Sequence, residues 1–461
     1  MKAVFTVCMI AALIAGPVCV SGEPVESAGS IKAHSSKRYF QDATGKPVFL
    51  IGYYNWASVA DGYYIDHPAR YSAMIKQGMP YKINYIRISL GINTFNSSTD
   101  PPVWSGSPTP APFLYVNGKA NLDKWDSTFW DGLKAQCRLA RDKGVIAHIS
   151  IFDGVELRGG SEAYRYNNSF WKPSNQTKTF YSDPDTNGND NIDERNEFYR
   201  LSDFNNNTGL GFYQRKIIDK AISETAAYDN VFYEIGNELL SSSEDWNTAV
   251  INYVKSKTSK PITDCGGDKT ANLMGWSQHS ADTPAQVKSN VASIVGHGYP
   301  AWEDPDGPDL SASNISPDYL RRAAWYSFVG GAACWGGFTA DFWGNERGFW
   351  KPTAAYYKNL QSFIKDSGAK FWEMQPNHDL VSNPKVNSCL AKTTSEYIVY
   401  VLNDSTVTVD LSDVTGKAAY RIYNPKTGVW STNQTIEGVG KRTFKKPVKA
   451  DDWAIYIHAR N

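Results

Sequence analysis

The chain has 461 residues, of which 41% are hydrophobic, enough for one large domain or for two or three smaller ones. Its 47 basic and 47 acidic residues give a formal net charge of zero, which argues against nucleic acid as a partner. Aromatic residues make up 13% of the chain, and they can fill a large core or form flat contact surfaces.

Residues 1–22 have the three parts of a secretory signal peptide. Lys2 supplies a positive charge, an apolar stretch runs from Val4 to Ile14, and small residues around Ser21 offer a cleavage site. That stretch is too short to cross a bilayer, and no later segment has 18 consecutive apolar residues. We therefore expect no membrane span and an exported protein that is secreted, periplasmic or at the cell surface. A retained N-terminal anchor is the alternative.

Two of the six cysteines, Cys8 and Cys19, lie within this leader. The other four are widely spaced and form no CxxC pair, so a zinc site is not expected. They are Cys137, Cys265, Cys334 and Cys389. An exported protein can hold a disulfide among them, and four buried thiols fit the sequence equally well.

Residues 31–374 alternate short apolar runs with amphipathic stretches, which is typical of repeated β-α units. The predicted strands are 47–54, 83–90, 145–152, 231–237, 261–265, 272–279, 299–303 and 331–338. Helices are predicted between them, for example at 127–143 and 212–228. Eight strands with intervening helices predict an α/β fold, the (β/α)8 TIM barrel, whose active sites lie at the carboxyl ends of the strands. Long polar loops at 93–121 and 153–207 follow two of these ends.

From about Gln375 the pattern changes to short β runs separated by turns, with a strong Asn-Pro-Lys-Thr-Gly turn at 424–428. This pattern predicts a small antiparallel β-sandwich. The expected division is a signal peptide at 1–22, a barrel at 23–374 and a sandwich at 375–461. Because no long linker separates the last two, we expect them to pack together.

The predicted fourth strand ends in Asn237-Glu238, after the apolar run VFYEIG. This strand end resembles that of the large clan A of retaining (β/α)8 glycoside hydrolases, in which Asn-Glu closes the fourth strand. The resemblance implies that Glu238 is the general acid/base and that Asn237 contacts the sugar 2-hydroxyl. Glu234 lies deeper on the same strand, and we interpret it as structural. A surface Glu at a helix start is the alternative for Glu238.

A retaining mechanism needs a second carboxylate about 5–5.5 Å from the first. In clan A it comes from the end of the seventh strand, which implies Glu303 as the nucleophile. Asp304 and Asp306 are rivals within the same acidic cluster, and a plain surface loop is the alternative for all three.

Other side chains near the predicted strand ends are candidates for the same pocket. Clan A members often carry an Arg on the second strand beside the nucleophile and a His or Tyr on the sixth strand facing it. The resemblance therefore implies such roles for Arg87 and His279. Further candidate sugar contacts are His148, Asp153, Asn55, Trp56 and Trp335. For each of these residues, a structural role inside the barrel is the alternative.

Three segments are similar to the apiosidase-like family of bacterial barrels: FQDATGKPVFLIG at 40–52, DNVFYEIGNE at 229–238, and RRAAWY followed by GGA at 321–332. That family often ends in a β-domain with a closing Asp-Trp strand, here Asp452-Trp453, and family names label the domain as collagen-binding. Such a label is inherited and does not by itself indicate collagen binding. At the first strand, GYYNW stands where the family is expected to have GDTAW.

Residues 183–194, DPDTNGNDNIDE, match the calcium-loop pattern D-x-[DN]-x-[DN]-G-x5-E at every specified position. Oxygen side chains at alternate positions suit Ca²⁺. The predicted ligands are Asp183, Asp185, Asn187, Asn189 and Glu194. Because the flanks are not clearly helical, we expect an isolated loop that rigidifies the insertion. A solvated polar loop is the alternative. No cofactor is expected for catalysis.

These patterns and resemblances predict an exported retaining glycoside hydrolase that acts on poly- or oligosaccharides by double displacement. A transglycosidase with the same two carboxylates is an alternative. A non-catalytic glycan-binding protein, or an adhesion protein acting through the C-terminal domain, are alternatives of a different class.

Overall fold

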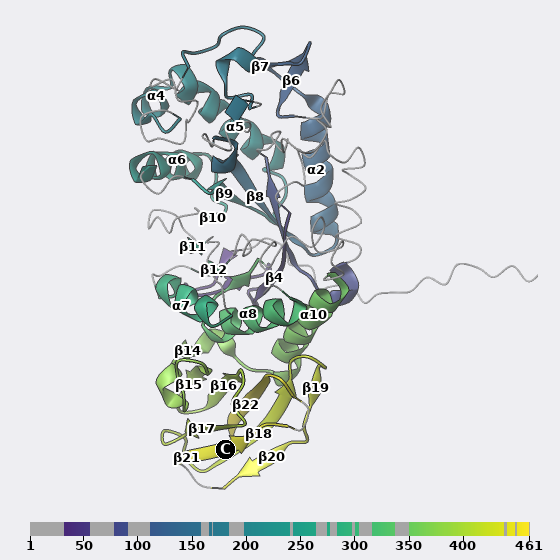
Figure 1. Cartoon of the computed structure of the whole chain (residues 1–461), viewed down its shortest axis with the longest axis vertical. Helices are drawn as coiled ribbons and strands as arrows, with labels where there is room; N and C mark the ends of the chain where they lie inside the picture. The colour runs from purple at the N-terminus through teal and green to yellow at the C-terminus, as the bar shows by residue number, and fades with distance from the viewer. Residues whose placement is uncertain are drawn as a thin grey trace, which may run out of the picture.

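The computed structural model describes most of the chain after residue 31 (Figure 1). The described residues are 32–55, 78–90, 111–157, 166–167, 169–183, 198–239, 243–263, 274–276, 284–296, 300–303, 316–336, 350–437, 440–447 and 450–460. At 53–55, 79, 155, 274–276, 284–285, 301–303 and 350 the description covers the backbone alone. No helix in these ranges is long and apolar enough to cross a membrane.

Eight strands form one parallel sheet in the order β10-β9-β8-β5-β4-β13-β12-β11. They are β4 (Leu50–Asn55), β5 (Tyr85–Ser89), β8 (Ile146–Asp153), β9 (Val231–Asn237), β10 (Ile262–Thr263), β11 (Met274–Trp276), β12 (Ala301–Glu303) and β13 (Cys334–Trp335). Each overlaps one of the eight predicted strands. The first and last of them, β4 and β13, pair with each other, as they do in a barrel. No ladder between β10 and β11 lies within the described residues, and the chain between these strands, 264–273, is outside them.

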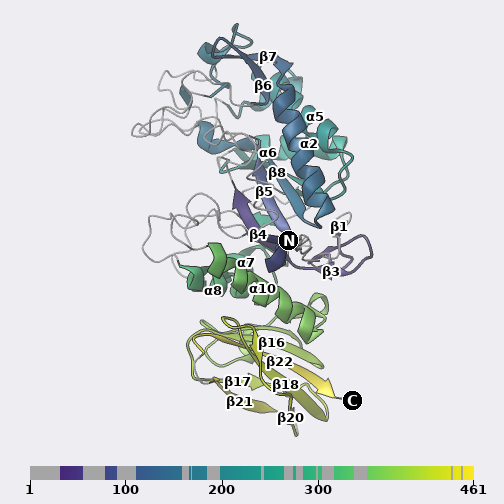
Figure 2. The same cartoon turned by 90° about the vertical axis from the view of Figure 1, so that its right-hand side faces the viewer.

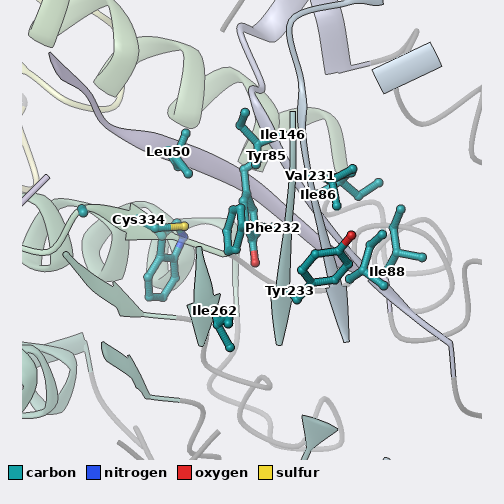
Figure 3. Packing of buried hydrophobic residues seen from close by; sticks show 14 of the residues in the cluster. Leu50, Tyr85, Ile86, Ile88, Ile146, Val231, Phe232, Tyr233, Ile262 and Cys334 are labelled. Carbon is teal, nitrogen blue, oxygen red and sulfur yellow. The ribbon is translucent and has the colours of Figure 1, made fainter. Parts of the chain in front are cut away.

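The central strands β5, β8 and β9 are buried at every residue. Strands covered on both faces are apolar along most of their length, and the sequence shows these three as mainly apolar runs in which Arg87, His148 and Glu234 are buried exceptions. Figure 3 shows part of this interior, where Tyr85, Phe232 and Ile146 come from three adjacent strands. The buried cluster continues into the surrounding helices.

Helices cover the sheet, and two of them begin at side chains that cap the first turn. They are α2 (Ser127–Asp142), α4 (Leu201–Asn206), α5 (Gly209–Thr225), α6 (Glu244–Lys257), α7 (Pro284–Ile294), α8 (Pro317–Val329) and α10 (Trp350–Ser367). Asp126 caps α2 by accepting a hydrogen bond from the Thr128 amide at 2.9 Å. Ser316 caps α8 in the same way through the Tyr319 amide at 3.1 Å.

Two small antiparallel units precede or interrupt the parallel sheet. Strands β1 (Lys32–Ala33), β2 (Phe40–Gln41) and β3 (Pro47–Val48) form the first. The hairpin of β6 (Phe113–Val116) and β7 (Lys119–Trp125) forms the second. Its turn is Asn117-Gly118, with φ of 50° and 75°, the pair that a tight two-residue hairpin favours.

The described part of the insertion 153–207 packs at the carboxyl end of β8 through an aromatic cluster. The Trp171 and Phe198 rings lie 5.4 Å apart, and the Phe198 and Trp246 rings lie 5.8 Å apart. Trp246, on α6, also lies 5.5 Å from Phe152 of β8. The insertion is therefore anchored beside the strand ends, as the sequence predicts.

The C-terminal region is antiparallel β structure. One sheet contains β14 (Gln375–Pro376), β15 (Ser388–Lys392), β16 (Glu396–Val401), β22 (Trp453–Arg460), β18 (Lys417–Asn424), β19 (Val429–Trp430) and β20 (Gln434–Ile436), and a second contains β17 (Thr406–Asp410) and β21 (Lys441–Lys445). A shared apolar cluster joins the two sheets, with Val399 on β16, Val407 on β17 and Phe444 on β21.

Strand β16 explains how this region attaches to the rest of the chain. Its odd-numbered residues Tyr397, Val399 and Val401 belong to the C-terminal core, whereas Ile398 and Tyr400 belong to the large cluster around the parallel sheet. Because successive side chains of a strand point to opposite faces, β16 is buried on both sides. Helices α7, α8 and α10 lie between the parallel sheet and the C-terminal strands (Figures 1 and 2).

At the centre of this contact is a buried ion pair, which we call the junction pair, between Arg321 on α8 and Asp452. Arg321 Nε lies 3.1 Å and Nη2 2.5 Å from Asp452 Oδ1, and both side chains are fully buried. Tyr400 donates to Asp452 Oδ2 at 2.8 Å and stacks on Trp325 of α8 at 5.5 Å. The Arg-Arg-Ala-Ala-Trp segment and the closing Asp-Trp pair are thus the two halves of one interface.

Further polar contacts surround the junction pair. Lys288 of α7 donates to the Asn387 carbonyl at 2.6 Å, and Tyr423 of β18 donates to the Asn359 carbonyl of α10 at 2.8 Å. Phe363 stacks on Trp430 at 5.0 Å. The two regions are therefore packed together, as the absence of a linker predicts. Among the described cysteines, Cys137, Cys334 and Cys389 are buried free thiols.

Candidate active site

The carboxyl end of β9 changes from buried to accessible over two residues. Asn237 is 2% exposed, whereas Glu238, the next residue, is half-buried. Glu238 has φ of 46°, in the left-handed region that side-chain-bearing residues rarely adopt. Such a conformation costs on the order of 1–3 kcal/mol and persists where the surroundings impose it, often at functional sites. The backbone of Glu238 thus turns away from the strand at the rim of the sheet.

Beneath Glu238 lies a second buried ion pair, which we call the interior pair, between Arg87 on β5 and Glu234 on β9. Arg87 Nε donates to Glu234 Oε2 and Arg87 Nη2 to Glu234 Oε1, both at 2.7 Å. Both side chains are fully buried, and the fork-on-carboxylate geometry is the strong form of this contact. Burial raises the pKa of Glu234, and the Arg87 cation opposes that rise.

The interior pair extends to the amide of Asn237. Arg87 Nη2 donates to Asn237 Oδ1 at 3.0 Å, and Asn237 Nδ2 donates to Asp153 Oδ1 at 3.4 Å. A donor at one end and a carboxylate at the other fix which way the amide points. Four side chains therefore form a buried chain from Glu234 to Asp153 below the half-buried Glu238.

The structure shows which side chains Arg87 meets within the described residues, whereas the side chain of Glu303, beside which the resemblance places Arg87, lies outside the description. The described contacts of Arg87 are with Glu234 and Asn237, so it belongs to the β5–β9 side of the sheet. The interior salt bridge, an alternative that the sequence left open, is what the structure shows. Glu234, interpreted from the sequence as structural, is its anion.

His148 and Trp335 both lie in the packed interior. The Nδ1 atom of His148 is 2.7 Å from the Tyr85 hydroxyl, and its Nε2 atom is 2.9 Å from Thr263 Oγ1. Burial and the nearby Arg87 charge lower the pKa of His148 well below its ordinary value. Trp335 is also fully buried, and its Nε1 donates to the Tyr357 hydroxyl at 2.7 Å. These positions match the packing alternative and leave neither side chain exposed to a sugar.

Several other predicted site residues fall at or outside the limits of the description. Glu303 and Asn55 are the last residues of β12 and β4, so their backbones lie at the carboxyl ends of parallel strands. Outside the described residues lie His279, Trp56, Asp304 and Asp306.

The predicted calcium loop is described only at its first position. Asp183 is exposed, and its Oδ1 accepts a hydrogen bond from the Tyr166 hydroxyl at 2.9 Å. The remaining predicted ligands, Asp185, Asn187, Asn189 and Glu194, lie outside the described residues. Within the described ranges, no group of three or more His, Cys, Asp or Glu side chains gathers as a metal site.

Two residues at this site were not singled out by the sequence reasoning. Gly154 follows β8 directly, and its α-carbon lies against the backbone of Glu238. Glu156, in the 3-10 turn Gly154–Leu157, is a carboxylic acid that is only 1% exposed. An Asp-Gly step at the end of an apolar strand was the available signal for Gly154, since glycine there marks a close backbone approach.

Comparisons with known proteins give one partial family match and many similar folds. Residues 376–458 match the family described as "putative collagen-binding domain of a collagenase". No curated protein matches the chain by sequence. A solved structure named glycoside hydrolase is 13% identical, with a TM-score of 0.61, over 94% of this chain and 97% of its own. A glycoside hydrolase of family 5 from Bacteroides vulgatus is 12% identical, with a TM-score of 0.64, over 94% of each chain. At these identities the likeness establishes the fold, and it spans both the parallel sheet and the C-terminal strands.

Proposed function

We propose that the protein is an exported glycoside hydrolase of the retaining type, built on a closed (β/α)8 barrel with a C-terminal β-sandwich. The observation that carries the proposal is the end of β9. There a half-buried Glu238 follows an Asn237 whose amide is held by Arg87 and Asp153. The similar folds named as glycoside hydrolases support the same conclusion. The substrate class is a poly- or oligosaccharide.

In the proposed mechanism Glu238 is the general acid/base and Glu303 is the nucleophile. Glu238 protonates the leaving glycosidic oxygen while Glu303 attacks the anomeric carbon, and Glu238 then removes a proton from the water that releases the glycosyl-enzyme. Both residues lie at the carboxyl ends of parallel strands, β9 and β12. Closure of the sheet between β10 and β11 would place these two strands on facing walls of the barrel.

The interior pair assists by orienting Asn237. Because Arg87 donates to Asn237 Oδ1, the amide presents its nitrogen to Asp153. We propose that this nitrogen donates to the sugar 2-hydroxyl, a contact that strengthens in the transition state. His279, Asn55 and Trp56 remain proposed sugar contacts.

A screen with matched variants tests the proposal. Purified protein is incubated with plant, algal and bacterial polysaccharides and with aryl glycosides, and reducing-sugar release is compared among wild type, Glu238→Gln and Glu244→Gln, an exposed Glu at the start of α6. Release by wild type and by Glu244→Gln, but not by Glu238→Gln, is expected. Equal release by Glu238→Gln contradicts the acid/base role.

The nucleophile has its own test. Glu303→Gly is expected to be inactive and to recover turnover with added azide, giving a glycosyl azide of inverted configuration, because azide occupies the space of the lost carboxylate. A fully active Glu303→Gly excludes this residue and leaves Asp304 and Asp306 for the same test.

We also propose that the loop 183–194 binds Ca²⁺. Its alternating oxygen side chains suit this hard cation, and the anchoring of Asp183 to the buried Tyr166 supports a fixed loop entry. Wild type is expected to melt at a higher temperature in Ca²⁺ than in EGTA, and Glu194→Gln to lose that difference. The same melting temperature for wild type in both buffers excludes the site.

A further inference from the structure

We propose that the dipeptide Asp153-Gly154, at the carboxyl end of β8, positions Asn237 and Glu238. Asp153 acts through the amide of Asn237, and Gly154 acts through the backbone of Glu238. Both are positioning residues and not sugar ligands. This inference deepens the proposed function, since it rests on Glu238 being the acid/base.

The two dipeptides lie side by side because of the strand register. In the parallel ladder of β8 and β9 the last two pairs are Phe152 with Gly236 and Asp153 with Asn237. Both chains leave the sheet immediately afterwards. Gly154 begins a 3-10 turn, and Glu238 adopts φ of 46°. The residue after each strand end therefore faces its counterpart.

The backbone of Glu238 comes so close to position 154 that only glycine fits there without displacing it. A Cβ atom added at Gly154 would lie 2.1 Å from the carbonyl oxygen of Glu238, 2.8 Å from its carbonyl carbon and 3.3 Å from the Asn237 carbonyl oxygen. All three are backbone atoms of a strand end, which cannot rotate away as a flexible side chain can. Even the methyl group of Ala must displace the peptide that carries Glu238.

Asp153 fixes the side chain of Asn237, its partner on the neighbouring strand. Its carboxylate is 4% exposed and accepts from Asn237 Nδ2 at 3.4 Å, while Arg87 holds the other end of the amide at 3.0 Å. A group so buried is better placed to orient Asn237 than to bind a sugar hydroxyl. Together Asp153 and Gly154 constrain both residues that the mechanism uses at this strand end.

Gly154→Ala provides the test, with Gly132→Ala as the matched control. At Gly132, in α2, an added Cβ meets no heavy atom within 4 Å. The probes are phenyl and 2,4-dinitrophenyl glycosides of the sugar that wild type hydrolyses. Phenolate needs a proton to leave, whereas dinitrophenolate does not, so misplacing the general acid affects the two unequally.

We expect Gly154→Ala to lower kcat/KM on the phenyl glycoside by about 100-fold, within the range that one positioned acid contributes, and on the dinitrophenyl glycoside by less than about 5-fold. Glu238→Gln should show the same pattern more strongly, and Gly132→Ala should match wild type. An equal loss on both glycosides from a folded Gly154→Ala, or no loss on either, overturns the role of Gly154.

Asp153→Asn is a second test of the proposal, and it does not depend on whether Gly154→Ala folds. A positioning role predicts that kcat falls by about 10-fold or more at an unchanged KM, since an amide in place of the carboxylate removes a charge-assisted contact that orients Asn237. A raised KM at an unchanged kcat identifies Asp153 as a sugar ligand and overturns its positioning role. If wild type hydrolyses no member of the panel, the proposed function fails, and this inference fails with it.

Discussion

Two buried arginine–carboxylate pairs lie in the part of the chain that the structure describes, and they serve different ends of the molecule. The interior pair, Arg87 with Glu234, lies below the end of β9, and the junction pair, Arg321 with Asp452, joins α8 to the C-terminal strands. All four side chains are fully buried, and both arginines contact both oxygens of the carboxylate. Seen as contacts alone, the two pairs are nearly equivalent.

The two ion pairs differ in the third side chain that each one contacts. Arg87 also holds Asn237, next to the candidate acid/base, whereas Asp452 also accepts from Tyr400 in the packed interface. A buried ion pair is by itself weak evidence for stability or for function, because desolvation offsets much of the attraction. The comparison teaches that the role of such a pair is read from what else its members hold.

The largest effect is expected from Glu238 at the proposed catalytic end. Glu238→Gln removes the transferable proton but keeps the size of the side chain, so kcat/KM should fall by about 10³-fold or more on substrates with poor leaving groups. The melting temperature should stay close to that of wild type because Glu238 is half-buried. A loss matched by a similar fall in folded protein contradicts a catalytic role.

The next effect concerns the junction pair. Arg321→Met leaves the Asp452 carboxylate buried without its cation, which should lower the free energy of unfolding by about 3–5 kcal/mol in urea titrations. Arg322→Met, at the half-buried neighbouring position, is the control and should change it by less than about 1 kcal/mol. If Arg321→Met is as stable as its control, the junction pair is not what fixes the C-terminal region.

Replacing each pair with apolar residues sharpens the comparison. Arg321→Met/Asp452→Leu/Tyr400→Phe should recover much of the stability lost in Arg321→Met, since an apolar substitute leaves no unpaired charge. Arg87→Met/Glu234→Met should be more stable than Arg87→Met alone for the same reason. Its activity should nevertheless stay about 10²-fold below that of wild type, because Asn237 has lost the group that orients it. Wild-type kcat in this double variant would make the interior pair purely structural.

Each end also contains a histidine whose pKa is lowered, mainly by desolvation. At the junction, burial and the charge of Lys288 lower the pKa of His378 from 6.5 to about 4, and the pKa of His148 near the interior pair is lowered well below 6.5. Between about pH 6.5 and 4 the unfolded chain binds protons on these rings that the folded chain does not. Stability should therefore fall as the pH drops through this window, at roughly 1.4 kcal/mol per pH unit for one ring at most.

Urea titrations at pH 7, 6 and 5 check this dependence. His378→Gln, whose amide oxygen can still accept from the Cys389 backbone, should show a shallower decline than wild type. A stability that is flat or rises towards pH 5 would contradict the lowered pKa of these two rings.

The smallest effect is expected from Tyr400→Phe. It removes the 2.8 Å hydrogen bond to Asp452 but keeps the ring stacked on Trp325, so the free energy of unfolding should fall by about 1–2 kcal/mol. Glycosidase activity per folded molecule should not change. A reduced activity in this variant would indicate that the junction communicates with the catalytic end.

The sequence predicted the parts of this structure that depend on local pattern. Mainly apolar runs identified the parallel strands, and the Asn-Glu step identified the candidate acid/base at the end of one of them. The deeper position of Glu234 followed from its even spacing along that strand.

Contacts between segments that are distant in the sequence were not predictable from local patterns. Which carboxylate Arg87 meets depends on the register between β5 and β9 through β8, and sequence spacing does not encode it. For the same reason, the sequence shows Arg321 and Asp452 only as parts of two separate family motifs, although the two residues form one ion pair. The close approach of Gly154 to Glu238 also needs coordinates, since glycine at a strand end has several uses.

The most direct measurement compares the two ends in one assay. Activity per folded molecule is measured for wild type, Glu238→Gln and Arg321→Met on the best substrate of the panel, with the folded fraction taken from urea titrations. The predicted result is a loss of about 10³-fold for Glu238→Gln and an unchanged value for Arg321→Met. A fully active Glu238→Gln, or an Arg321→Met that folds but loses activity, would contradict a catalytic end at β9 separate from a structural junction at α8.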